Sequence, residues 1–231
     1  MTTTSTRPAA PTKARREWWI PASLLALTLV PVAAGVFRVA ELAAGEANET
    51  NQRFFDMPVP VIVHIIGATT FCVLGAIQFM PSLRRRRPRW HRWSGRILVP
   101  VGIAAGLSGM WMAAFSDLPV HDNPALMWIR LVFGSLMVTG LVLGILAILR
   151  RDVRTHQRWM ARAYAVAQGA GTQALILGPM VLLSNGQGVD QPAGNLKATG
   201  MAAAWVINLA VAEWLVRRSQ APRSAQSSRR V

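Results

Sequence analysis

Long uncharged apolar runs alternate with short clusters of arginine along this chain. A helix that crosses a bilayer needs about 20 mostly apolar residues, because the hydrocarbon core is about 30 Å thick and each residue rises about 1.5 Å. Backbone groups cannot stay unpaired in lipid, and the runs show no strand-like alternation, so we expect them to be helices. Six runs are long enough, at residues 18–37, 57–80, 97–115, 131–149, 163–183 and 198–216.

The pattern therefore predicts an all-α membrane protein, whose six transmembrane helices form one bundle over residues 18–216. Residues 1–17 form a basic arm and residues 217–231 a basic tail, and both are predicted to be disordered because they are rich in Ser, Thr, Pro and Arg. The first apolar run exceeds the roughly 7–15 residues of a signal-peptide core. We therefore expect it to be a retained helix rather than a cleaved signal.

The basic residues predict the orientation of this bundle. Of the 25 Lys and Arg residues, 21 lie in the arm, in the tail and in two connections at 84–96 and 150–162. Lys and Arg gather on the cytoplasmic side of a membrane, so both termini are predicted to be cytoplasmic, in a bacterial inner membrane. The same clusters are expected to attract anionic lipid headgroups.

The overall composition agrees with a membrane protein and argues against a nucleic-acid partner. The net charge is +15, yet 52% of the residues are hydrophobic and only 15% are charged. A nucleic-acid-binding domain would spread its arginines over one face of a soluble fold. The chain also has no Gly-rich phosphate loop, Cys-x-x-Cys or His-Glu-x-x-His motif, so no enzyme class is indicated.

A repeated phrase contains two of the four histidines. His91 and His156 each stand one or two residues before an Arg-Trp-x-small-Arg sequence, at the start of the third and fifth predicted helices. Helix N-termini and neighbouring arginines disfavour protonation, so both imidazoles are expected to be neutral and able to bind metal. The pair could hold the iron of a b haem, with the propionates on the flanking arginines Arg92, Arg96, Arg158 and Arg162.

Other interpretations of these polar residues remain open. His, Arg and Trp at a helix entrance are also typical of a membrane-interface anchor. His64 is a third candidate metal ligand, because an ionisable residue within a spanning helix usually faces the bundle interior. His121 is expected in a solvated loop, and Arg130 is expected to reach towards the interface. Gln173 is expected to hydrogen-bond between helices.

Two family resemblances rest on these motifs. The segment from His64 to Pro179 resembles the domain of unknown function 2306 family of bacterial multi-pass membrane proteins. The matching pieces are His64 with residues 75–79, the phrase at 91–96 and the phrase at 156–164. The layout is also similar to cytochrome b561-type proteins, which have six helices and histidines on the second to fifth.

The second resemblance implies a function. It pairs His91 with His156 and His64 with His121, to hold two b haems for electron transfer within or across the membrane. The sequence does not indicate the electron donor or acceptor. The alternative is a membrane permease, or an accessory or structural membrane subunit without haem.

Overall fold

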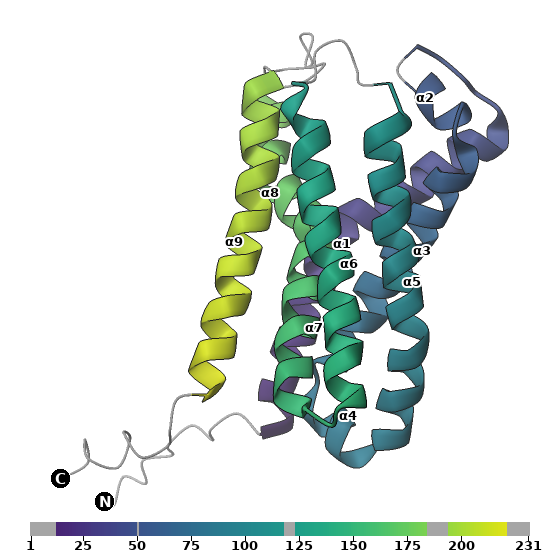
Figure 1. Ribbon diagram of the computed structural model, residues 1–231. Helices are drawn as coiled ribbons and strands as arrows, with labels where there is room; N and C mark the ends of the chain where they lie inside the picture. Colours follow the sequence, from purple (N-terminus) through teal and green to yellow (C-terminus); the bar gives the residue numbers. More distant parts are fainter. Residues whose placement is uncertain (1–12, 50, 118–122, 184–193, 221–231) are drawn as a thin grey trace, which may run out of the picture.

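The computed structural model describes residues 13–49, 51–117, 123–183 and 194–220. Every regular element within these residues is a helix, which confirms the all-α prediction (Figure 1). The helices are α1 (Lys13–Ala44), α2 (Gln52–Phe55), α3 (Pro58–Gln78), α4 (Pro81–Arg86), α5 (Pro88–Phe115), α6 (Ala125–Leu149), α7 (Val153–Ala167), α8 (Gly169–Leu183) and α9 (Gly194–Gln220).

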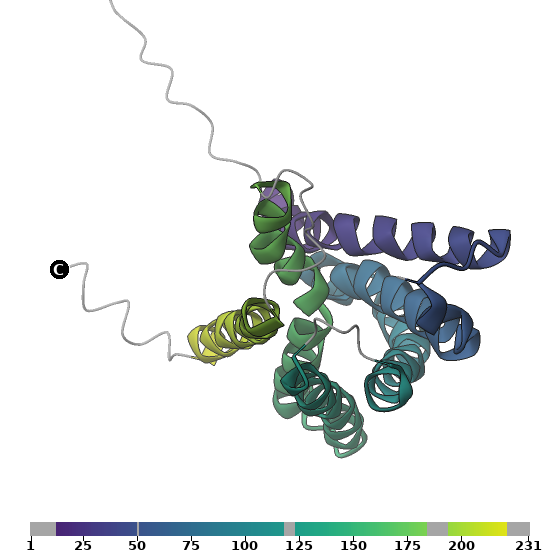
Figure 2. The same cartoon turned by 90° about the horizontal axis from the view of Figure 1, so that it is seen from above.

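Four of these helices pack as a closed ring. Helix α3 packs against α5, α5 against α6, α6 against α7, and α7 back against α3. Helices α5 and α7 are therefore diagonal to each other, as are α3 and α6. Outside the ring, α1 packs against α3 and α8, and α9 packs against α7 and α8 (Figure 2).

Apolar side chains from all four ring helices fill the middle of the ring. The buried cluster includes Phe71, Leu98, Leu141 and Tyr164, one from each helix in the order α3, α5, α6 and α7. Small residues bring the backbones together, as expected where no hydrophobic force acts between helices in lipid. A Cβ atom at Gly140, for example, would lie 3.2 Å from the Cβ of Ala163.

Five helices in the described part of the chain are long and apolar enough to cross a membrane: α1 from Trp18, α3, α5, α6 and α9. The fifth predicted run, at 163–183, is divided into α7 and α8, which have 15 residues each and meet at Gln168. The predicted count of six uninterrupted spanning helices therefore differs from the structure at this one run.

Two side chains from α9 explain the break between α7 and α8. Trp205 Nε1 donates to the carbonyl oxygen of Val166 at 3.1 Å, and Asn208 Nδ2 donates to that of Ala165 at 3.1 Å. These two carbonyls lie in the last turn of α7, where a continuous helix would bond them to later backbone N–H groups. Inserted side-chain donors and the helix-weakening glycine at 169 together interrupt the ladder.

The helix ends also differ from the predicted runs. Several helices continue past their apolar parts, because polar and basic turns stay helical beyond the stretch that hydropathy detects. Helix α1 begins within the predicted arm, at Lys13, and α9 continues into the predicted tail as far as Gln220. Helix α5 begins at Pro88, nine residues before the predicted run, so His91 lies inside the helix. Residues 1–12, 221–231 and His121 lie outside the described residues.

Candidate functional site

His91 and His156 come from diagonal helices of the ring and lie at the same end of the bundle, where α4 packs. His91 is in the first turn of α5, and His156 is in the first turn of α7. Arg84, His156 and Arg92 are all near enough to His91 to act on it electrostatically. The structure thus brings together the two histidines of the repeated phrase.

A backbone hydrogen bond orients His156. Its Nδ1 lies 2.8 Å from the carbonyl oxygen of Gly144 on α6. A carbonyl can only accept, so Nδ1 donates the proton and Nε2 of the neutral ring keeps its lone pair. Asp152 caps the same helix by accepting from the Thr155 N–H at 3.0 Å. Hydrogen bonds from Thr155 hold the pKa of the Asp152 carboxyl below its ordinary value, so the cap stays ionised.

The surroundings of His91 leave polar atoms unsatisfied. His91 Nδ1 is buried and has no hydrogen-bond partner among the described residues, and the same holds for Gln78 Oε1. The other amide atom of Gln78, Nε2, donates to the Ser94 hydroxyl at 2.6 Å. Ser94 lies one helical turn after His91, so both unsatisfied atoms belong to the same end of the bundle. A buried polar atom without a partner costs about 1–3 kcal/mol.

The arginines around His91 and His156 differ in their exposure and in their ion pairs. Arg162 donates from Nε and Nη2 to Glu213 Oε2 on α9, at 3.1 and 2.7 Å. The predicted haem partner Arg162 is therefore already engaged in an ion pair. Arg92 and Arg96 are exposed, and Arg158 is partly buried.

Arg84 was not singled out from the sequence, where it is one member of a run of four arginines. In the structure it is partly buried, and its charge acts on His91. Burial lowers the pKa of Arg84 below its ordinary value, and neighbouring Arg85 lowers it further. An anionic group at this position would relieve both effects.

His64 occupies a separate site, towards the α2 end of the ring. Its Nδ1 lies 2.8 Å from the carbonyl oxygen of Ala105 on α5, so its Nε2 also keeps a lone pair when the ring is neutral. Gly109 makes room for the ring, since a Cβ there would lie 3.0 Å from His64 Cε1. Within the described residues, no group of three or more His, Cys, Asp or Glu side chains could hold a metal ion.

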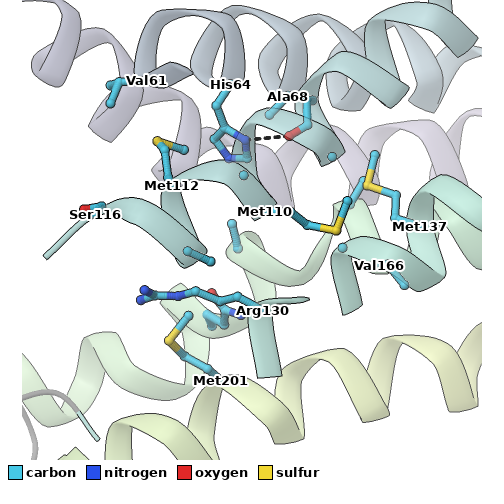
Figure 3. Close-up of a pocket in the computed structure, with 18 of the residues that line it drawn as sticks. Val61, His64, Ala68, Met110, Met112, Ser116, Arg130, Met137, Val166 and Met201 are labelled. Carbon is cyan, nitrogen blue, oxygen red and sulfur yellow. Dashed lines mark hydrogen bonds between the residues drawn. The ribbon is translucent and has the colours of Figure 1, made fainter. Parts of the chain in front are cut away.

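His64 lines a cavity of about 370 Å³ (Figure 3). The walls come from α2, α3 and α5–α9, and His91 and His156 are not part of them. Arg130 lies along this cavity rather than only at the interface where the sequence placed it. Four methionines contribute to the lining: Met110, Met112, Met137 and Met201.

Gln173 contributes an unsatisfied donor to the same cavity. Its Nε2 is buried and has no hydrogen-bond partner in the described ranges. The expected hydrogen bond between helices is thus not seen for this nitrogen. In the sequence, Gln173 is recognisable only as a glutamine inside an apolar run. That pattern does not distinguish a glutamine that packs between helices from one that faces a ligand.

The family described as predicted membrane proteins (DUF2306) matches residues 61–216. This range is more than half of the chain and includes His64, His91 and His156. No curated protein and no solved structure matches the chain. The extent of the family match and the apolar helices lead to one conclusion: the chain belongs to the DUF2306 family of membrane proteins.

Proposed function

We propose that this protein binds a b-type haem through His91 and His156 and transfers electrons within or across the membrane. One observation supports the proposal: His91 and His156 lie at the same end of the bundle on diagonal helices, and a buried ring nitrogen of His91 has no partner in the described part of the chain. Haem-binding helix bundles take axial ligands from facing helices in this way.

The number of candidate ligands favours haem over a bare metal ion. Structural zinc usually takes four protein ligands, whereas haem iron needs at most two axial ones, because the porphyrin supplies the others. Bound haem would supply one-electron redox chemistry at this end of the bundle. The carbonyl of Gly144 would fix the ring of His156 with Nε2 available, as backbone acceptors commonly do for ligating histidines.

The basic residues near His91 would hold the haem propionates. Arg84 is better placed for this role than Arg162, because Arg162 already pairs with Glu213. Charge-assisted hydrogen bonds from guanidinium groups to carboxylates are among the stronger protein hydrogen bonds. Arg92, Arg96 and Arg158 belong to the same basic end and remain candidates for the second propionate.

The haem prediction is tested by assaying protein purified from cells with ample haem supply. We expect the pyridine haemochrome assay to find b-type haem in stoichiometric amount with the chain. Folded protein that is colourless under these conditions would contradict the proposal. The alternative without haem, a permease or accessory subunit, would then be favoured.

We further propose six membrane crossings with both termini in the cytoplasm of a bacterium. Helices α7 and α8 follow each other along the bundle and together would span about 45 Å at about 1.5 Å per residue, enough for one crossing (Figure 1). The α4 end would then face the cytoplasm. The exposed arginines there would contact anionic lipid headgroups: Arg85, Arg86, Arg87 and Arg89.

Reporter fusions test this topology. Fusions after Asn48, Asn123 and Gln191 are expected to report the periplasm, because few basic residues flank them. Fusions after Arg87, Arg154 and Arg223 are expected to report the cytoplasm. A cytoplasmic signal from the Asn123 fusion would contradict the six-crossing arrangement, and a periplasmic signal after Arg223 would show that α7 and α8 do not make one crossing.

A further inference from the structure

The cavity beside His64 is lined by one hydrogen-bond acceptor and one hydrogen-bond donor. His64 donates from Nδ1 to the Ala105 carbonyl, which leaves Nε2 of the neutral ring as an acceptor. Gln173 Nε2 is a buried donor without a partner within the described residues. The first group comes from α3 and the second from α8, so a ligand that satisfies both must bridge the cavity.

The remaining walls suit an apolar and largely aromatic body. The cavity volume of about 370 Å³ falls within the range of about 300–1,000 Å³ typical of small-molecule sites. Methionine side chains are flexible and make favourable contacts with aromatic rings. Trp205 adds an aromatic wall, and its ring stacks on Phe133 with centroids 4.7 Å apart.

The charge of the lining favours an oxygen-rich polar end. Arg53 and Arg130 both line the cavity, and none of the described residues that line it is acidic. A ligand that carries partly negative oxygens is therefore favoured over a cationic one. A fatty-acid carboxylate would pair with this positive charge, but it has no proton to donate to His64. A hydroquinone has both a hydroxyl donor and oxygen acceptors on an apolar ring.

We propose that this cavity binds the head ring of a lipid-soluble quinol. One ring hydroxyl donates to His64 Nε2, and another ring oxygen accepts from Gln173 Nε2. Binding depends only on the cavity and does not require haem. The role of this quinol as the electron carrier for the haem rests on the proposed function.

Calorimetric titration of the detergent-purified protein with decylubiquinol, under anaerobic conditions, tests the site. We expect saturable binding to the wild type and about tenfold weaker binding to His64→Ala and to Gln173→Leu, since each removes one hydrogen bond in a desolvated site. Gln157→Leu is the matched control, because Gln157 is exposed on α7 and does not line the cavity. Its affinity should equal that of the wild type.

Further arms separate the quinol site from its alternatives. Laurate should not displace decylubiquinol, because it lacks the donor that His64 requires. Gly109→Ala crowds the His64 ring and should also weaken binding, which keeps the test informative if His64→Ala does not fold. His156→Ala should still bind decylubiquinol, so a failure of the haem proposal is distinguishable from a failure of this one.

Four results would overturn the quinol site. The first is the absence of saturable binding to folded wild-type protein. The second is an unchanged affinity in both His64→Ala and Gln173→Leu, and the third is displacement by laurate at equal strength. The fourth is a second b haem that disappears in His64→Ala, which would assign the cavity to haem.

Discussion

Replacement of either His91 or His156 by alanine is expected to abolish the six-coordinate b-haem spectrum of the purified protein. In the proposed site each variant would remove one of the two axial ligands, so the iron would be five-coordinate or the site would be empty. The Soret position and the reduced-state α band typical of six-coordinate b haem should therefore be lost. Absorption spectra before and after reduction with dithionite measure this directly.

Two other histidine variants serve as controls for this experiment. His64→Ala changes a site whose cavity does not include His91 or His156, so the haem proposed between those two histidines should remain. His121→Ala should leave the same spectrum intact, since the proposed pair of His91 and His156 does not use it. The proposal is wrong if His91→Ala or His156→Ala, folded by circular dichroism, retains a six-coordinate spectrum.

Gly171→Ala is expected to destabilise the fold by about 1–3 kcal/mol, as over-packing typically does. A Cβ atom at this position would overlap the backbone carbonyl of Leu27 on α1. Backbone cannot rotate away as a flexible side chain can, so α1 and α8 must move apart. Among the described helices, α3 and α8 are the two main neighbours of α1, so separating α1 from α8 removes one of the two.

Gly178→Ala is the matched control for this prediction. It makes the same substitution in the same helix, but nothing lies within 4 Å of the added Cβ among the described residues. Thermal unfolding in detergent should show a lower midpoint for Gly171→Ala and an unchanged or higher one for Gly178→Ala, because alanine favours helix over glycine. Equal midpoints for the two variants would contradict the close approach of α1 and α8.

Local patterns in the sequence predict much of this fold but not the break at Gln168. The second, third, fourth and sixth apolar runs each correspond to one helix of the described chain: α3, α5, α6 and α9. The first run lies within α1. The fifth run is divided because Trp205 and Asn208 donate to carbonyls about 40 residues earlier in the chain. Hydropathy and glycine content do not carry this tertiary information.

The candidate sites show the same division between local and long-range information. The repeated phrase identifies His91 and His156, because both histidines stand one or two residues before Arg-Trp. Arg162 forms its ion pair with Glu213, which is 51 residues away in the sequence, and no local motif predicts this pair. The cavity beside His64 requires seven helices to be placed at once, so its pairing of His64 with Gln173 emerges only from the structure.

The axial ligation of the iron tests the central claim most directly. Low-temperature electron paramagnetic resonance of the oxidised, purified wild-type protein is predicted to show the low-spin ferric signal of bis-imidazole coordination. The signal should disappear in His156→Ala and persist in His64→Ala. A high-spin signal in the wild type, or no haem signal from folded protein, would contradict the assignment of His91 and His156 as a ligand pair.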